Sequence, residues 1–279
     1  MTNRRSFLAQ SATAGLAATA TSLAAAPASS TSTGNIKLGV ASYSFREFQR
    51  GLAIKYTKQL GIPYINIKEF HQSYKISPED LQKGRKAFES AGLTILGGGT
   101  ITFNKEDEAD IRSYFEYAKN SGMPLMVSAP TKKTLPMLEK FVKEYDIKVA
   151  VHNHGPEDKN FPSARDVIAM VKNMDPRIGC CIDIGHESRT GNNVLETLDI
   201  VGPRLLDMHV KDLKDPLVRD SQCDVGDGVL PIVGVFKHLN KIKYQGGVML
   251  EYEINADNPL MGMGRSLSFM RGVMAGLAG

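Results

Sequence analysis

Short apolar runs and helical stretches alternate eight times along the chain. Each run has the composition of a buried strand, and in the segment after it apolar residues recur with helical spacing. Ser77 before Pro78 marks one helix start, and Ser163 after Pro162 marks another. The runs cover residues 36–45, 63–70, 93–99, 124–130, 147–155, 177–186, 204–212 and 246–254. The predicted helices cover about 47–60, 78–90, 105–121, 131–145, 163–173, 192–201, 231–240 and 260–277.

Eight strand-helix units predict an α/β protein with a single-domain (β/α)8 TIM barrel over residues 36–279. The alternative is an open, doubly wound parallel sheet. That fold normally carries a G-x-G-x-x-G phosphate turn early in the chain, and "LGGGT" at 96–100 lacks this spacing. The alternation therefore favours the closed barrel.

The first 28 residues have the features of a twin-arginine export signal. Arg4 and Arg5 precede Phe7 and Leu8, and an acid-free stretch of small and apolar residues ends at Ala26-Pro27-Ala28. We expect cleavage there, a short linker at 29–35 and a periplasmic location. The alternative is a low-complexity tail. The stretch lacks the ~20 strongly apolar residues of a membrane span, and no cysteine directly after it could accept a lipid. We therefore expect no membrane anchor after cleavage.

Charge and cysteine content narrow the class of partner. Loss of residues 1–28 removes two arginines and no acid, so the net charge falls from +4 to +2. A nearly neutral surface offers no broad basic field for nucleic acid or for an anionic membrane, and it favours a small-molecule ligand. The cysteines are odd in number, and Cys180 and Cys181 lie in the apolar run "IGCCIDIG", where core packing is expected. Cys223 lies apart from them.

Ionisable side chains gather where the apolar runs end, which is the edge that carries the active site in TIM barrels. Because side chains alternate along a strand, residues two apart share a face. His152 with His154, His209 with Lys211, and Glu251 with Glu253 are such pairs. The strand-end residues are His71, His152, His154, Asp183, His186, His209, Lys211, Glu251 and Glu253.

Two or more imidazoles and two carboxylates from four neighbouring strands predict a divalent metal site. Burying such groups is costly unless a cation or a polar network compensates them. Mixed nitrogen and oxygen ligands suit Mn, Co, Fe or Zn, whereas magnesium prefers more oxygen. The alternative is that each histidine is a hydrogen-bonded structural group, the commoner role of a single strand-end histidine. His238, within a helix, is expected at the surface and outside the site.

Several motifs, taken in order, carry a family resemblance. "CIDIGH", "MHVKD", "VGDG" and "MLEYE" resemble the xylose-isomerase-like barrel superfamily of sugar isomerases, epimerases and AP endonucleases. "ASYSF" and "IKEFH" resemble its exported bacterial members, described as sugar phosphate isomerase/epimerase. The resemblance implies one metal ion held by His152, Asp183, His209 and Glu251. It further implies that His186 contacts a substrate oxygen and that Lys68, His71 and Lys211 line the substrate pocket, to which we add Glu253.

One position departs from the epimerases of this family. They are similar in having glutamates at the fifth and eighth strands, whereas this chain has His152 at the fifth. An imidazole lone pair committed to a metal cannot also accept a proton, so the two-carboxylate scheme does not transfer. We expect a metal-dependent, isomerase/epimerase-like enzyme in which Glu251 removes a proton beside a sugar carbonyl held by the metal, through an enediolate. His154, His186 and Lys211 are the candidate acids.

Three other functions are weighed against this one. A lyase or hydratase acting by elimination on keto-glycosides would share the first proton transfer. A barrel that binds sugar without turnover is a further alternative. Phosphodiester hydrolysis would need a multi-metal cluster and a basic groove, which the charge balance does not support. The sequence leaves open the sugar, the metal and whether the chain forms homo-oligomers.

Overall fold

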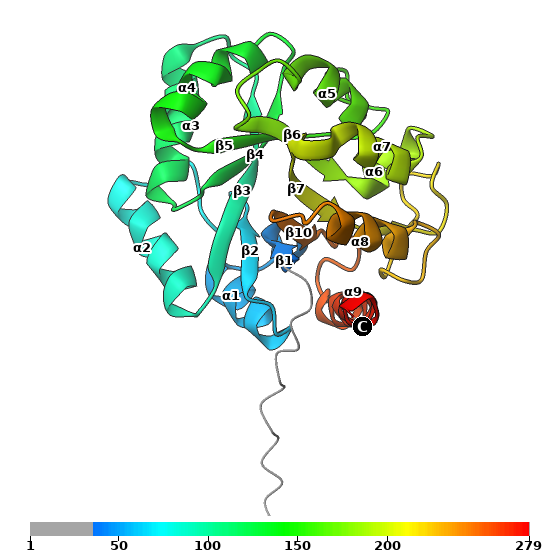
Figure 1. The fold of residues 1–279 in the computed structure, drawn as a ribbon. Coiled ribbons are helices and arrows are strands. Elements are labelled where there is room, and N and C mark those ends of the chain that lie inside the picture. The colour runs from blue at the N-terminus through cyan, green and yellow to red at the C-terminus, as the bar shows by residue number, and fades with distance from the viewer. Residues whose placement is uncertain (1–35, 279) are drawn as a thin grey trace, which may run out of the picture. The chain divides into compact units, whose positions relative to one another are not determined.

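Eight parallel strands close into a barrel in the computed structural model, which describes residues 36–278 (Figure 1). The strands are β1 (Lys37–Ala41), β2 (Tyr64–Ile67), β3 (Thr94–Phe103), β4 (Leu125–Pro130), β5 (Lys148–His152), β6 (Ile178–Asp183), β7 (Leu205–Val210) and β10 (Gly247–Leu250). Their order around the barrel is β1-β10-β7-β6-β5-β4-β3-β2, so chain neighbours are also barrel neighbours. The predicted (β/α)8 fold is confirmed.

Helices surround the strands (Figure 1). They are α1 (Arg50–Gln59), α2 (Pro78–Ser90), α3 (Glu108–Asn120), α4 (Leu138–Tyr145), α5 (Ala164–Val171), α6 (Ile184–Arg189), α7 (Val194–Val201), α8 (Ile232–Lys241) and α9 (Leu260–Ala278). Short 3-10 turns are η1 (Ser42–Phe45), η2 (Leu135–Met137) and η3 (Gly202–Arg204). None of the helices within 36–278 is long and apolar enough to cross a membrane.

Two predicted helix starts are confirmed by side-chain caps. Ser77 Oγ accepts a hydrogen bond of 3.1 Å from the backbone N–H of Asp80. Ser163 caps α5 in a capping box, because its Oγ accepts from Asp166 N while the Asp166 carboxylate accepts from Ser163 N. Such caps satisfy backbone donors that have no partner within the helix.

Two segments near the site differ from the expected pattern. Helix α6 forms directly after β6, over the end of the sixth predicted run, because Asp183 caps it by accepting a 2.8 Å hydrogen bond from His186 N. The long segment after β7 contains an antiparallel pair, β8 (Asp212–Leu213) and β9 (Gln222–Cys223). Both segments lie at the carboxyl ends of the barrel strands, so both shape the mouth of the barrel.

Apolar side chains fill the barrel and the layer between strands and helices. Cys180 and Cys181 are buried on adjacent positions of β6, as expected, and all three cysteines are free thiols. The predicted signal at 1–28 and linker at 29–35 lie outside the described residues.

Candidate active site

Four adjacent strands bring the predicted metal ligands together. His152 ends β5, Asp183 ends β6, His209 lies in β7 and Glu251 follows β10. Asp183 is in register with His209, and Glu251 N donates to Val210 O, which sets the Glu251 side chain level with the end of β7. All four side chains are buried, and one nitrogen or oxygen from each lies within 4.8 Å of the others. The closed barrel therefore assembles the set that sequence reasoning proposed.

The spacing of these atoms suits a single cation. His152 Nε2 lies 3.1 Å from His209 Nδ1 and 3.7 Å from Asp183 Oδ2. His209 Nδ1 lies 3.1 Å from Glu251 Oε2. Ligands about 2.1 Å from a metal, at bond angles of about 90–109°, lie about 3.0–3.4 Å apart. Two facing imidazole nitrogens with a carboxylate beside them are therefore close to the arrangement of a coordination shell.

Protonation states also suit a metal. Burial lowers the pKa of His209 to about 4, so its imidazole is neutral at pH 7. Burial opposes ionisation of Asp183, but Lys211 and His186 outweigh it and hold its pKa well below the usual value. For Glu251, burial is likewise outweighed by His209, Lys68 and Lys211, and its pKa is low. Neutral imidazole and ionised carboxylate are the forms that bind metal.

Asn153, between His152 and His154 in the "HNH" stretch, positions Asp183. It is fully buried. Its Oδ1 accepts a 2.8 Å hydrogen bond from Asp183 N, and its Nδ2 donates to Asp183 O at 3.2 Å. A buried amide that satisfies both backbone groups of one residue fixes that residue firmly. The "HNH" stretch thus supplies one candidate ligand and the anchor for the next.

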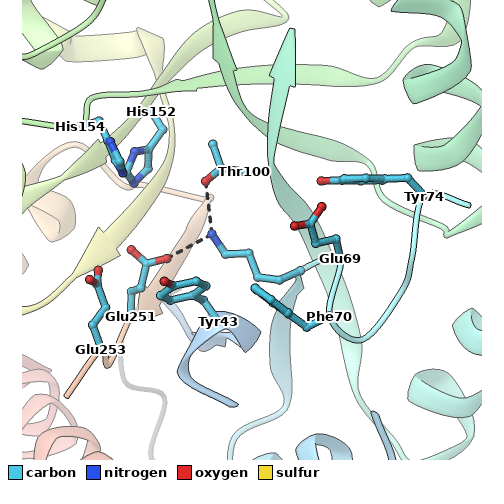
Figure 2. A pocket seen from close by; sticks show the side chains of 10 residues that line it. Tyr43, Glu69, Phe70, Tyr74, Thr100, His152, His154, Glu251 and Glu253 are labelled. Carbon is cyan, nitrogen blue, oxygen red and sulfur yellow. Dashed lines mark hydrogen bonds and ion pairs between the residues drawn. The ribbon is translucent and has the colours of Figure 1, made fainter. Parts of the chain in front are cut away.

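Two buried lysines balance the carboxylates. Lys68 Nζ lies 3.2 Å from Glu251 Oε1 and donates to Thr100 Oγ1 at 3.2 Å, the two contacts dashed in Figure 2. Lys211 Nζ lies 3.1 Å from Asp183 Oδ2 and 3.3 Å from Glu251 Oε2, and it also contacts Glu253. Although burial acts to lower the pKa of Lys211, these three carboxylates raise it well above its usual value.

Gly185 lets Lys211 reach these carboxylates. A Cβ at position 185 would lie 2.5 Å from Lys211 Cγ, closer than packed carbon atoms approach. The glycine of "CIDIGH" therefore matters because its missing side chain leaves room for the Lys211 stem, and not because a turn requires it.

A cavity of about 230 Å³ opens beside the candidate ligands (Figure 2). In this view His152, His154, Glu251 and Glu253 stand opposite Glu69 and Tyr74. Its lining residues are Tyr43, Lys68, Glu69, Phe70, Tyr74, Thr100, His152, His154, Glu251 and Glu253. Aromatic faces with convergent polar groups are typical of small-molecule sites.

A second cavity of about 290 Å³ shares Tyr43, His154 and Glu253 with the first. It is lined in addition by His186 and Lys211. Burial lowers the pKa of His186 to about 3, and burial with His152 nearby lowers the pKa of His154. Of the three candidate acids, His154 thus lines both cavities, whereas His186 and Lys211 line the second.

His71 was expected to line the pocket, but it does not. Its Nδ1 lies 2.9 Å from Ser42 Oγ, and its Nε2 lies within 3.2 Å of the carbonyl oxygens of Phe45 and Phe48. The chain turns after β2, with His71 N donating to Lys68 O, and this turn directs the imidazole into the protein. Burial lowers its pKa, so it is a neutral structural group that ties β2 to the segment after β1.

His238 is outside the site as expected, but it is not a surface residue. Its side chain is only 10% exposed, and Nδ1 lies 3.5 Å from Asp199 Oδ1. The reason is that this part of α8 packs against α7.

Several site residues escaped the sequence reasoning. Tyr43 and Phe70 lie near the ends of predicted apolar runs, in motifs that carried the family resemblance, but an aromatic residue there gives no signal that separates pocket lining from core packing. Asp207 lies inside an apolar run rather than at its end, 2% exposed, and burial raises its pKa to about 8. The signal for Asp207 was present, because it shares a strand face with His209 and Lys211.

Comparison with known proteins places these features in context. A family model described as xylose isomerase-like TIM barrel matches residues 54–273. No curated protein matches the sequence.

Solved structures share the fold. An uncharacterized protein from Parabacteroides distasonis is 26% identical, with a TM-score of 0.67 over 85% of this chain and 99% of that chain. The IolI protein with a bound zinc atom is 18% identical, with a TM-score of 0.70 over 86% and 99%. The 3-keto-D-glucoside 4-epimerase YcjR from E. coli is 16% identical, with a TM-score of 0.67 over 85% and 99%.

Proposed function

We propose a divalent-metal-dependent sugar isomerase or epimerase function for this chain, which belongs to the xylose isomerase-like TIM-barrel family. The single observation that carries the proposal is the convergence of four buried ligand atoms from His152, Asp183, His209 and Glu251 beside a cavity. Mixed nitrogen and oxygen ligands favour Mn, Co, Fe or Zn. When bound, the cation would polarise a sugar carbonyl and acidify the adjacent C–H.

Glu251 is our candidate base, acting through Oε1. Its Oε2 faces His209 and Lys211, whereas Oε1 faces Lys68. An oxygen that is not shared with the ligand cluster remains available to a substrate proton. Lys68, 3.2 Å away, would stabilise negative charge that develops on the substrate oxygen. Return of the proton to the neighbouring carbon, together with transfer of the hydroxyl proton from one substrate oxygen to the other, completes an isomerisation.

The lining of the first cavity supports a carbohydrate substrate. Tyr43 and Phe70 offer ring faces to the apolar C–H side of a sugar, while Lys68 and Glu253 offer a hydrogen-bond donor and acceptor to its hydroxyls. The balanced charge of the chain agrees with a small ligand rather than nucleic acid. Export to the periplasm is also proposed, on the sequence of residues 1–28 alone.

Elimination from a keto-glycoside is the second candidate, and one observation favours it. His186 and Lys211 line the second cavity, which shares three residues with the first. A substituent lying there would be next to the Lys211 ammonium, which carries a proton that a leaving oxygen could take, and next to the neutral His186 imidazole, which could donate a hydrogen bond to that oxygen. The proton abstraction by Glu251 would be unchanged.

The test uses the full-length protein, stripped with a chelator and reloaded with Mn²⁺, Co²⁺, Fe²⁺ or Zn²⁺ one at a time. Keto-sugars and keto-glycosides are incubated in D₂O, and products are followed by NMR and mass spectrometry. Isomerisation incorporates deuterium into a product that keeps every substituent of the substrate, whereas elimination releases one substituent. Absence of both metal binding and metal-dependent turnover would refute the proposed function.

A further inference from the structure

A carboxyl group lies inside the barrel, one inward-facing position deeper than the candidate ligand His209. Asp207 precedes His209 by two residues on β7, so both side chains point to the same face of the strand. Asp207 Oδ2 accepts a 2.7 Å hydrogen bond from Asn66 Nδ2 of β2, and the Cys181 thiol of β6 donates to it at 3.7 Å. Contacts from two other strands thus fix this oxygen.

The two nitrogens of His209 have different surroundings. Nδ1 faces His152 Nε2 and Glu251 Oε2, each at 3.1 Å. Nε2 faces the interior, is buried, and has no hydrogen-bond partner within the described residues. The Asp207 Oδ2 atom lies 3.9 Å from Nε2. A small rotation of the His209 ring toward this fixed oxygen would bring the two atoms to hydrogen-bond distance.

The tautomer of His209 decides whether Nδ1 can bind a cation. A neutral imidazole carries one proton, and the nitrogen without it is the one that offers a lone pair. A proton on Nδ1 would point among the ligand atoms and block coordination. An acceptor beside Nε2 stabilises the opposite tautomer and orients the ring.

We propose that Asp207 is a positioning residue that keeps the His209 proton on Nε2 and thereby presents Nδ1 to the metal. The inference rests on the proposed function for the presence of a metal, but its effect on the tautomer is independent of it. A purely packing role explains Asp207 poorly, because burying a carboxyl group costs free energy that burying leucine would not, and Asp207 is only 2% exposed.

The experiment compares wild type with Asp207→Leu, which removes the acceptor, and Asp207→Asn, which keeps the shape but replaces one carboxyl oxygen by an amide NH₂. Histidine tautomers are read by ¹⁵N NMR of the chelator-treated, full-length protein, with His209→Gln to assign the resonance. Co²⁺ and Zn²⁺ affinities are measured by titration calorimetry. Loss of such an outer partner typically weakens metal affinity by about 10–100-fold. We expect that loss for Asp207→Leu, a smaller one for Asp207→Asn, and a mixed His209 tautomer in both.

The matched control is Asp212→Asn. Asp212 is equally buried, 1% against 2% exposed, but it accepts backbone N–H groups of Gly226 and Leu230 instead of facing a ligand. It should leave both the tautomer and the metal affinity unchanged, so general destabilisation is separated from positioning.

The outcomes are distinct. A folded Asp207→Leu protein with wild-type affinity and an unchanged tautomer overturns the inference. If Asp207→Leu does not fold, Asp207→Asn decides by the same two measurements. If the wild type binds no metal, the proposed function fails, and the tautomer alone still decides the role of Asp207.

Discussion

Lys211 provides the sharpest test of the charge balance in the site. Its ammonium contacts Asp183, Glu251 and Glu253, and its side chain is only 5% exposed. Replacement by methionine keeps much of the apolar stem but removes the ammonium that these three carboxylates share, while the Lys68 ammonium still pairs with Glu251. We expect the metal-free Lys211→Met protein to be less stable and to bind divalent metal more tightly.

The structure sets the size of both effects. Removing one partner of a buried ion pair costs about 3–5 kcal/mol. Asp183 and Glu251 are almost fully buried and count in full, while Glu253, 36% exposed, adds little. A metal would contact Asp183 Oδ2 and Glu251 Oε2, the same oxygens that Lys211 contacts, so Lys211 opposes binding by charge repulsion. We expect at least about tenfold tighter binding, or about 1.4 kcal/mol, in the variant.

The assay is urea unfolding of the full-length protein, followed by circular dichroism, in EDTA and in Co²⁺. Co²⁺ at about 100 times its Kd should stabilise the wild type by about 2.7 kcal/mol, and the variant by more at the same concentration. The matched control is Lys83→Met, because Lys83 pairs with Asp80 at 2.8 Å but is 75% exposed. Its expected cost is much smaller, because an ion pair between solvent-exposed side chains contributes little to stability. The reasoning would be refuted if Lys211→Met and Lys83→Met lost equal free energy of unfolding in EDTA. It would also be refuted if the same Co²⁺ concentration stabilised Lys211→Met and the wild type equally.

Three further predictions concern the candidate ligands. Glu251→Gln should abolish turnover with only a modest loss of metal, and an active variant in the deuterium assay would place the base elsewhere. His152→Ala should lower bound metal, measured by plasma emission, whereas His238→Ala should not; equal metal contents would remove His152 from the ligand set. Because the pKa of His209 is about 4 when folded against 6.5 ordinarily, the unfolded state gains the proton first on acidification. The contribution of neutral His209 to the free energy of unfolding is present above pH 6.5 and is lost as the pH falls toward 4. Between pH 7 and pH 5, the free energy of unfolding of metal-free His209→Asn, measured in urea, should therefore fall by about 2 kcal/mol less than that of the wild type.

The sequence by itself determined the architecture and the candidate ligands. Strand and helix periodicity is local, so eight alternations were enough to predict a barrel. A parallel barrel also places all strand ends at one edge, so imidazoles and carboxylates from four strands could be expected to converge before any coordinates. The family resemblance then implied the set His152, Asp183, His209 and Glu251. Cap signals at Ser77 and Ser163 were reliable for the same reason, because a cap depends on residues within one turn.

Only the tertiary structure decided where the other side chains point. His71 turns inward because Ser42 and two carbonyl groups from the segment after β1 bind its ring, and no local pattern encodes those partners. Lys211 reaches three carboxylates only because Gly185, on another element, leaves room for its stem. Asp207 became informative once Asn66 and Cys181 were seen to hold it beside His209. Such contacts join residues far apart in the chain, so they form only when the barrel closes.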